Sequence, residues 1–374
     1  MDSLPRRHHV YRKESERKRM SMRTALLIGV TVALLCGCVR KEILDDINIE
    51  SAVGFDEAGK EKIRGTIVIP VYKRGETANK TLTTVSSTAK DVLEELQYKT
   101  SEPLVSGSIE IALYGKQLAK QGIFPFIDQF RRDASIGTRL YLAVVDGTAK
   151  HLLEGNYGRQ GNGIYLSNLL KQNIERRDLP KTNLHLFLKT YYADGKDPFL
   201  PYIRRVGEDV QVIGVVLFRG DRVVDTIGQS DMFYFKIVAD GYSEGTHTVR
   251  LNNKKYVSIK NISTKRTISF SGPKTRPHIH VHIALEGIVR EYKHGPFTSA
   301  VRRSVEKTFE QQIRSQTEAL LRRFQEKQID PIGFGDLAAS RYRQFRHRDF
   351  YKHYSQLPIR ITADVTIRDT GIIE

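Results

Sequence analysis

Tryptophan is absent from this sequence of 374 residues, and cysteine occurs only twice. Both cysteines, Cys36 and Cys38, lie near the N-terminus, so the rest of the chain can form no disulfide and offers no thiol nucleophile. A second long apolar run is also absent after Leu35, and nothing beyond that residue is predicted to span a membrane. These absences describe a globular body that is stabilised by its hydrophobic core.

Evidence for catalysis is scarce as well. The sequence contains no His-Glu-x-x-His metal motif. Gly158, Gly161 and Gly163 lie in a turn-rich loop, but their spacing does not fit a dinucleotide-binding or phosphate-binding loop. No pair of acidic residues stands out as a catalytic couple. The chain is therefore predicted not to be an enzyme, with no cofactor and no metal ion.

Positive charge is in excess. The chain has 60 Lys and Arg against 43 Asp and Glu, a net charge of +17. Residues 1–37 hold eight of the basic and three of the acidic residues, which leaves +12 for the remainder. This balance favours an anionic partner. Because an export signal precedes the body, lipid headgroups or wall polymers are favoured over nucleic acid.

That signal is the most informative segment. Basic residues that end with Arg19 and Arg23 precede the apolar run 24–35 (TALLIGVTVALL), which is shorter than the roughly 20 residues needed to cross a bilayer. Residues 35–38 (Leu-Cys-Gly-Cys) fit a bacterial lipobox, in which an aliphatic residue and two small ones precede the lipid-bearing cysteine. Cys38 is therefore predicted to become the first mature residue, as an S-diacylglycerol and N-acyl cysteine that anchors the protein on the outer face of the cell membrane. A plain secretory signal and a short uncleaved anchor are the alternatives.

The start of the chain is unusual. The first nineteen residues are polar and mixed in charge, unlike the leading region of a secretory signal. Translation is predicted to begin at Met20 or Met22, with residues 1–19 as an extension of the gene model. A genuine long cytoplasmic leader is the alternative.

Strand and helix patterns alternate along the first half of the body. Ile63 to Val71 alternates with a period of two, which is typical of a half-buried strand, and Leu82 to Leu96 has helical spacing. Further strands are predicted at 105–113 and 139–146, and helices at 81–97, 115–132 with a break at Gly122, 163–176 and 182–192.

The second half is richer in strands. Arg219-Gly220-Asp221 is predicted to turn a hairpin, and Thr298 or Ser299 to cap a long helix that ends near residue 328. Strands are predicted at 210–218, 222–227, 246–251, 255–260, 265–270, 277–290 and 359–367, a short helix capped by Ser230 or Asp231 up to 239, and a helical piece at 334–354.

These patterns predict an α+β protein of three mixed domains, with antiparallel sheets and a long helix in the C-terminal domain. Breakers crowd residues 194–201, and Gly272-Pro273 interrupts the chain again. The predicted division is a leader and signal at 1–37, an N-terminal α/β domain at 38–205, a middle hairpin-rich domain at 206–274 and a C-terminal α+β domain at 275–374.

Two further constellations could carry chemistry. His278, His280 and His282 alternate on one face of a predicted strand and could share a metal, although a polar stripe that faces solvent is the favoured interpretation. Residues 341–352 interleave basic and aromatic side chains, a pattern that can bind nucleic acid or anionic lipid. A helix with aromatic residues inward and cations outward explains that pattern equally and is favoured.

Three segments resemble the spore germination protein C family, the Ger(x)C lipoproteins. The first is the lipobox with Arg40-Lys41-Glu42 and Gly54-Phe55-Asp56, and the second is the hairpin 213–224 (IGVVLFRGDRVV). The third is Asp330-Pro331-Ile332-Gly333-Phe334-Gly335-Asp336 after a long charged helix, followed by Leu357-Pro358 and a strand that ends at 365–371 (VTIRDTG). Val39 stands where the family usually has Trp, and the histidine strand is more often lysine-rich in the family. These departures leave open a divergent subtype.

The resemblance implies a three-domain α+β fold and a non-enzymatic subunit of a nutrient germinant receptor in the spore inner membrane. It further implies that this subunit works beside two polytopic partners, the A and B subunits, to trigger germination. A solute-binding lipoprotein of a membrane transporter is the alternative, and a secreted wall-active enzyme is a third possibility. The sequence does not identify the germinant.

Overall fold

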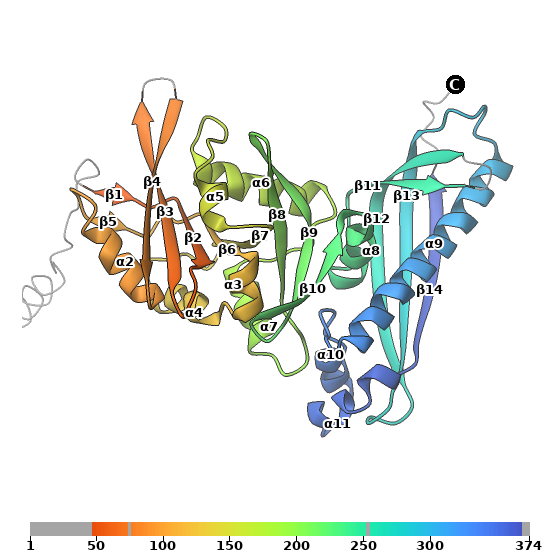
Figure 1. The fold of residues 1–374 in the computed structure, drawn as a ribbon. Coiled ribbons are helices and arrows are strands. Elements are labelled where there is room, and N and C mark those ends of the chain that lie inside the picture. The colour runs from red at the N-terminus through yellow and green to blue at the C-terminus, as the bar shows by residue number, and fades with distance from the viewer. Residues whose placement is uncertain (1–46, 74–75, 252–254, 369–374) are drawn as a thin grey trace, which may run out of the picture. The chain divides into compact units, whose positions relative to one another are not determined.

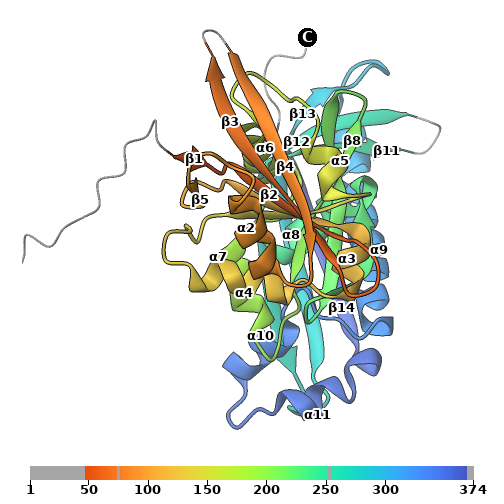
Figure 2. The ribbon, with the colours of Figure 1, turned by 60° about the vertical axis from the view of Figure 1, so that its left-hand side comes forward.

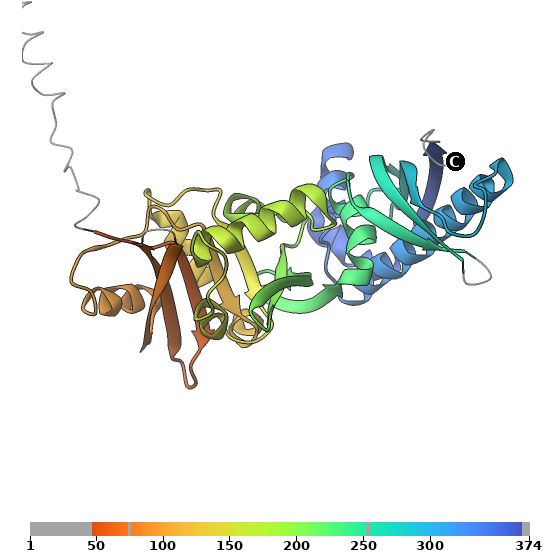
Figure 3. The same ribbon diagram turned by 90° about the horizontal axis from the view of Figure 1, so that it is seen from above.

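The computed structural model describes residues 47–73, 76–251 and 255–368. Cys38, the signal segment 1–37 and the candidate start residues Met20 and Met22 lie outside the described residues. Residues 48–374 form one compact unit. This unit contains every helix and strand of the described residues and is drawn in Figures 1, 2 and 3.

A mixed sheet of eight strands forms the first part of this unit. The strands are β2 (Ala52–Glu57), β3 (Ile63–Lys73), β4 (Glu76–Ser86), β6 (Ile111–Gly115), β7 (Tyr141–Val145), β8 (Phe199–Val206), β9 (Asp209–Arg219) and β10 (Arg222–Gly228). Their order is β10-β9-β8-β7-β6-β2-β3-β4. The central strands β2, β6, β7 and β8 are parallel, and the outer pairs are antiparallel. A separate parallel pair joins β1 (Asn48–Ile49) and β5 (Leu104–Val105).

Helices cover both faces of this sheet because its central strands are apolar on both sides. On β6, Ile111 and Leu113 enter one hydrophobic core, whereas Ala112 and Tyr114 enter the other. Gly54 allows a helix to approach β2 closely, since a Cβ there would lie 2.7 Å from the Cβ of Ala149. The first core includes α5 (Ala149–Leu153) and α6 (Asn162–Arg176), and the second includes α2 (Ala89–Gln97), α3 (Lys116–Gln121), α4 (Phe124–Arg132) and α7 (Leu184–Tyr191).

A second sheet follows, with β11 (Thr246–Arg250), β12 (Tyr256–Ser271), β13 (His278–Glu291) and β14 (Ile359–Arg368) in that order. The long helix α9 (Ser299–Glu326) lies across one of its faces (Figure 1). β14 pairs with β13 in parallel as the edge strand. The free side of β14 is partly blocked, because the N–H groups of Val365 and Ile367 donate to Glu310 and Glu306 of α9 at 3.0 and 2.9 Å.

Helix α8 (Gln229–Ala239) connects the two sheets. Its Phe235 is fully buried and packs edge-on against Phe199 of β8, at 5.3 Å between ring centroids, and against Phe324 of α9, at 5.9 Å. One hydrophobic core is therefore continuous from the first sheet to the second. The chain ends with short helices α10 (Phe334–Arg341), α11 (His347–Tyr351) and η3 (Tyr354–Gln356) before β14.

The sequence predicted the class and many elements correctly. The α+β class is confirmed by the mixed and antiparallel sheets. Thr298 caps α9, where its side chain accepts from the Val301 N–H. The hairpin β9–β10, the strands β3, β7, β11, β13 and β14 and the helices α3, α4, α6 and α7 lie where they were predicted.

The predicted helix 81–97 is wrong over its first part. Residues 81–86 belong to β4, and the helix begins at Ala89 with Thr88 as its cap. The run 81–86 (TLTTVS) is rich in β-branched residues, which favour a strand. It pairs with β3 as the edge strand of the first sheet, so strand pairing overrides the helical spacing of its leucine and valine.

Four smaller corrections follow. The predicted helix 334–354 is three short helices, and Gln344 between two of them has a left-handed backbone with a φ of 56°. Segments 255–260 and 265–270 are one strand, β12. The predicted strand 105–113 is split into β5 and β6 by a turn in which the Ile109 N–H donates to the Ser106 carbonyl. Neither Ser230 nor Asp231 caps α8, because that helix begins after Gly228.

The predicted domain boundaries stay a prediction. Residues 209–228, which were assigned to a middle domain, are the last two strands of the first sheet. In the described part of the chain, none of the helices is both long enough and apolar enough to cross a membrane.

Candidate functional site

Asp330 follows α9 and organises the loop that leads into α10. Its side chain is fully buried and accepts hydrogen bonds from the N–H groups of Gly333 and Gly335, at 2.8 and 2.9 Å, and from the Tyr351 hydroxyl at 3.0 Å. Gly333 has a φ of 86°, which favours glycine. Burial raises the pKa of Asp330 to about 6, although all of these donors act in the opposite direction. One carboxylate thus accepts hydrogen bonds from two backbone N–H groups of the loop 330–336.

Asp197 connects this loop to the first sheet. Its carboxylate accepts from the Asp330 N–H at 2.7 Å, while its own N–H donates to the Asp330 carbonyl at 2.9 Å. The carboxylate also accepts from the N–H of Gly220. The pKa of Asp197 is raised by desolvation, which these two hydrogen bonds partly oppose. The Asp197 carboxylate therefore joins Gly220 and Asp330, which lie far apart in the sequence.

The turn between β9 and β10 completes this arrangement. The guanidinium of Arg219 donates to the carbonyl of Lys327 at the end of α9. The Asp221 carbonyl accepts from the Ile123 N–H at 3.1 Å, and its carboxylate accepts from the Phe124 N–H at 3.2 Å, at the start of α4. Arg219 thus contacts the end of α9, Gly220 contacts Asp197, and Asp221 contacts the start of α4.

We call residues 195–197, 219–221 and 330–336 the joint. Its close packing requires glycine at 195, where a Cβ would lie 2.3 Å from the Asp336 nitrogen. From the sequence, 219–221 was predicted as a hairpin turn and resembled the family, 330–336 resembled the family, and 194–201 was predicted as a domain boundary. The roles of Asp197 and Tyr351 in linking these segments were not predicted. The density of breakers around Asp197 was the available signal, but its partners could not be read from it.

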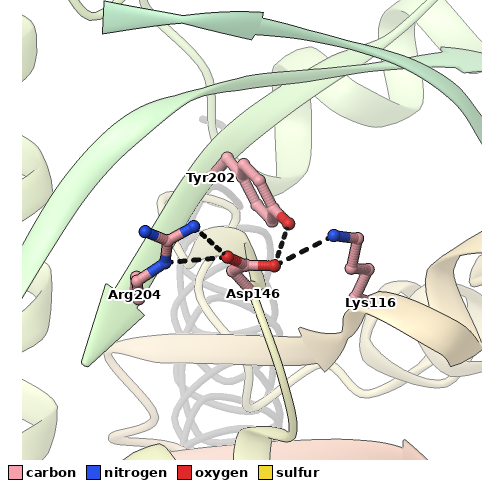
Figure 4. A network of polar contacts seen from close by, with 4 residues as sticks. All are labelled: Lys116, Asp146, Tyr202 and Arg204. Carbon is pink, nitrogen blue, oxygen red and sulfur yellow. Dashed lines mark hydrogen bonds and ion pairs between the residues drawn. The ribbon is translucent and has the colours of Figure 1, made fainter. Parts of the chain in front are cut away.

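A second polar cluster lies at the carboxyl ends of β6 and β7 (Figure 4). Asp146, directly after β7, accepts from Lys116 Nζ at 3.0 Å and from the Tyr202 hydroxyl at 2.5 Å. The guanidinium of Arg204 donates from Nε at 2.7 Å and from a second nitrogen. These donors converge on one carboxylate (Figure 4). This cluster was not predicted from the sequence, where the only signal was an acidic residue directly after the apolar run 141–145.

The chemistry of Asp146 follows from these contacts. The Tyr202 hydrogen bond, and after it those of Lys116 and Arg204, hold the pKa of Asp146 well below its usual range. A carboxylate that stays ionised at all physiological pH values cannot act as a general acid and is a poor general base. The cluster is therefore suited to fixing β8 and α3 against β7, not to proton transfer.

Asp56 explains one of the segments singled out in the sequence. It is the penultimate residue of β2, is almost fully buried and accepts hydrogen bonds from the N–H groups of Ala149 and Lys150 at 2.7 and 2.9 Å. These two groups lie in the first turn of α5, where N–H groups lack partners within the helix. Gly54-Phe55-Asp56 is thus accounted for by packing and capping.

The histidine strand is arranged as the alternation predicted. Ile279, Val281 and Ile283 are buried, while His280 Nε2 and His282 Nδ1 both lie within hydrogen-bond distance of the Thr362 hydroxyl, at 2.8 and 3.1 Å. The sequence showed no acidic neighbour, but β14 places Asp364 3.6 Å from His282. Over the described ranges, no group of three or more His, Cys, Asp or Glu side chains is placed to hold a metal ion.

Residues 241–245 form a Gly-x-Ser-x-Gly pattern, which in hydrolases holds a nucleophilic serine. Ser243 is fully buried, and its hydroxyl donates to Asp178 at 2.8 Å while it accepts from the Gly245 N–H at 3.2 Å. An activated serine needs an exposed hydroxyl and a base, usually histidine, within hydrogen-bond reach. The Ser243 hydroxyl is buried, and its partner is the carboxylate of Asp178 and not a histidine, so these contacts describe a structural turn.

Comparisons with known proteins agree along nearly the whole body. The profile of the spore germination protein N-terminal domain matches residues 40–205, and that of the spore germination B3/GerAC-like C-terminal domain matches residues 213–371. The chain is 28% identical to spore germination protein GerQC of Bacillus cereus over 94% of this chain and 100% of that protein. It is 24% identical to spore germination protein KC of Bacillus subtilis over 93% and 95%, respectively.

A solved structure has the same fold. The crystal structure of the GerBC protein superposes with a TM-score of 0.54 and 14% identity, covering 84% of this chain and 96% of that one. At this identity the likeness concerns the fold alone.

Proposed function

The chain belongs to the spore germination protein family that these two profiles define, and we propose that it is the C subunit of a nutrient germinant receptor. In this proposal it acts beside polytopic A and B subunits to trigger germination. The observation that carries the proposal is the ordered match of both domain profiles, residues 40–205 and 213–371. The match with GerQC, which covers 94% of this chain and 100% of that protein, supports it.

The polar clusters support a non-enzymatic role. Asp330 is enclosed by the donors of its own loop, and Asp146 is held ionised by its neighbours. Each carboxylate accepts hydrogen bonds from several groups of the protein itself: Asp146 from Lys116, Tyr202 and Arg204, and Asp330 from Gly333, Gly335 and Tyr351. Both are bonded in ways that fix elements in place, which suits a subunit that presents a rigid surface.

We further propose that Cys38 carries the lipid anchor and that the subunit lies on the outer face of the spore inner membrane. Two or three acyl chains hold a protein stably on a bilayer, whereas one chain holds it only marginally. The C-terminal body would then be attached through the short segment from residue 39 to residue 47.

Deletion of the gene tests the receptor function. Spores without it are expected to lose the response to one class of nutrient while they still germinate with a non-nutrient trigger, and the wild-type gene should restore the response. Normal germination with every nutrient tested, in a strain without a second copy, would contradict the proposal.

The anchor has a matched control in the neighbouring cysteine. Cys38→Ala is expected to abolish incorporation of labelled palmitate, because the acceptor thiol is gone. Cys36→Ala keeps the spacing and should be labelled as well as the wild type. Equal labelling of both variants would show that Cys38 is not the lipid site, without bearing on the receptor function.

A further inference from the structure

One end of the second sheet carries a dense group of cations that the proposed function does not use. It consists of two segments, residues 272–276 between β12 and β13 and residues 341–352 around α11, which we call the basic lobe. Its seven Lys and Arg residues are all exposed, and one acidic residue, Asp349, accompanies them. The seven are Lys274, Arg276, Arg341, Arg343, Arg346, Arg348 and Lys352.

The two segments form one surface. The Tyr342 hydroxyl donates to the Gly272 carbonyl at 3.3 Å, and Lys274 Nζ donates to the Gln344 carbonyl at 3.4 Å. A hollow of about 480 Å³ lies between them. Its lining is entirely polar or charged: Lys274, Thr275, Gln344, Arg346 and Asp349.

The aromatic residues of the lobe face inward. Phe350 and Tyr354 are fully buried, and their ring centroids lie 5.9 Å apart. Phe345 packs against Phe350 at 5.5 Å. This aromatic layer fixes the segment to the body and leaves the cations outside. Tyr342, Phe345 and Tyr351 are only partly exposed, and each packs against another aromatic ring of the protein. Stacking on the bases of a single-stranded nucleic acid is therefore disfavoured.

The positive charge of the lobe is largely uncompensated. Lys352 lies 3.9 Å from Asp349, but over the described ranges Arg276, Arg343 and Arg346 have no ion pair, and neither do Arg341 and Arg348. On α9, by contrast, four glutamates accompany six basic residues, and Arg322 and Arg323 are paired with Glu318 and Asp225. The lobe thus has the arrangement that the sequence favoured, with aromatic residues inward and cations outward, and most of its cations are left available to an external anion.

We propose that the basic lobe binds the phosphate headgroups of an anionic bilayer. The hollow would take one headgroup between Lys274 and Arg346, whose cations line it from two segments, and the surrounding arginines would contact neighbouring headgroups. Cations close to an anionic membrane surface attract it additively, and arginine pairs with phosphate through parallel N–H donors. This contact does not depend on the lipidation of Cys38 or on receptor partners.

Flotation with lipid vesicles tests this proposal. The protein is residues 39–374, because the described part of 48–374 is one compact unit with its own core. It is expected to float with vesicles that contain phosphatidylglycerol and not with phosphatidylcholine alone. The triple variant Arg343→Gln, Arg346→Gln, Arg348→Gln should bind about a hundredfold more weakly, since each cation contributes about a factor of five.

The matched control removes the same charge elsewhere. Arg303→Gln, Lys307→Gln, Arg314→Gln on α9 changes three exposed cations and should alter binding by less than about threefold. An equal loss in both triple variants would show that net charge alone drives binding, and would overturn the assignment to the lobe. Comparable melting temperatures of the variants exclude unfolding as the cause.

Two competitors identify the ligand. Inorganic phosphate at the same total concentration as the lipid phosphate should leave flotation unchanged. A free phosphate ion can occupy only the hollow, whereas a bilayer also contacts the surrounding arginines. Complete displacement by free phosphate would assign the hollow to a soluble anion. A single-stranded oligonucleotide that binds more tightly than the vesicles, with the same loss in the lobe variant, would assign the lobe to nucleic acid. Either result would overturn the membrane proposal.

Discussion

Asp146 and Asp330 each accept hydrogen bonds from at least three donors, and their pKa values shift in opposite directions. Asp146 is partly exposed, and its partners are Tyr202 and the cations of Lys116 and Arg204. Its pKa is held well below the usual range. Asp330 is fully buried among neutral N–H and O–H donors, and its pKa is raised to about 6.

The number of hydrogen bonds that a carboxyl group accepts therefore does not by itself determine its pKa. Burial removes water from Asp330, and neutral donors replace only part of its solvation. At Asp146, water is still near and two cations stabilise the charge. Asp330 therefore organises the loop 330–336 at an electrostatic cost. Asp146, as an ionised carboxylate, stabilises the junction of β7, β8 and α3.

The largest expected effect comes from Asp330→Asn. The amide nitrogen would face the N–H of Gly333 or Gly335, so that one donor is buried without an acceptor. We expect a loss of about 2–4 kcal/mol in the free energy of unfolding at pH 7, measured by urea titration. Asp336→Asn, at an exposed position of the same loop, is the control and should cost less than about 0.5 kcal/mol. Equal losses would show that Asp330 does not organise the joint.

The two carboxyl groups should also differ in their pH dependence. The folded pKa of Asp330, about 6, exceeds its ordinary value of 3.8. Protonation therefore stabilises the fold: the contribution is complete below pH 3.8 and is lost as the pH rises through 6. The stability difference between wild type and Asp330→Asn should shrink by up to about 3 kcal/mol from pH 4 to pH 7.

At Asp146, the change of folding stability with pH should have the opposite sign. Its lowered folded pKa contributes stability that is present above its ordinary value of 3.8 and is lost as the pH falls further. The difference between wild type and Asp146→Asn should therefore decrease on acidification below about pH 4. Urea titrations across this pH range measure both slopes, and slopes of the same sign would refute the comparison.

A smaller effect is expected from Gly195→Ala in the joint. The added Cβ would lie 2.3 Å from the Asp336 nitrogen, and relief of this overlap should cost about 2 kcal/mol. Gly137→Ala is the matched control, because a Cβ at Gly137 meets nothing within 4 Å. Thermal unfolding of both variants compares them, and an unchanged melting temperature for Gly195→Ala would mean that the joint is looser than described.

The smallest effect is expected at the Asp146 cluster. Tyr202→Phe removes one donor but leaves Lys116 and Arg204 in place, so we expect a loss of about 1 kcal/mol. Tyr192→Phe, at a side chain that is 57% exposed, serves as the control and should be neutral. If Tyr202→Phe were also neutral in urea titrations, the Tyr202 hydroxyl would not be a principal partner of Asp146.

The sequence was most predictive where local rules apply. The cap at Thr298 was visible at the start of its helix, and the alternation of the histidine strand correctly placed Ile279 and Ile283 on its buried face. The run 81–86 was misread because its leucine and valine have helical spacing, whereas its pairing with β3 decides its conformation.

The polar clusters could not be predicted in the same way. Asp197 and Asp330 are separated by 133 positions, and Tyr202 reaches Asp146 across 56. A single sequence contains no local signal for such pairs. The resemblance identified 219–221 and 330–336 as important segments, but only the fold shows that both contact Asp197.

Affinity capture of the protein from gently solubilised spore membranes, with its partners identified by mass spectrometry, tests the central claim most directly. The proposed function predicts two polytopic membrane proteins, the A and B subunits, in amounts comparable to the captured chain. Recovery of a permease with a nucleotide-hydrolysing subunit would contradict it and point instead to a solute-binding lipoprotein of a transporter.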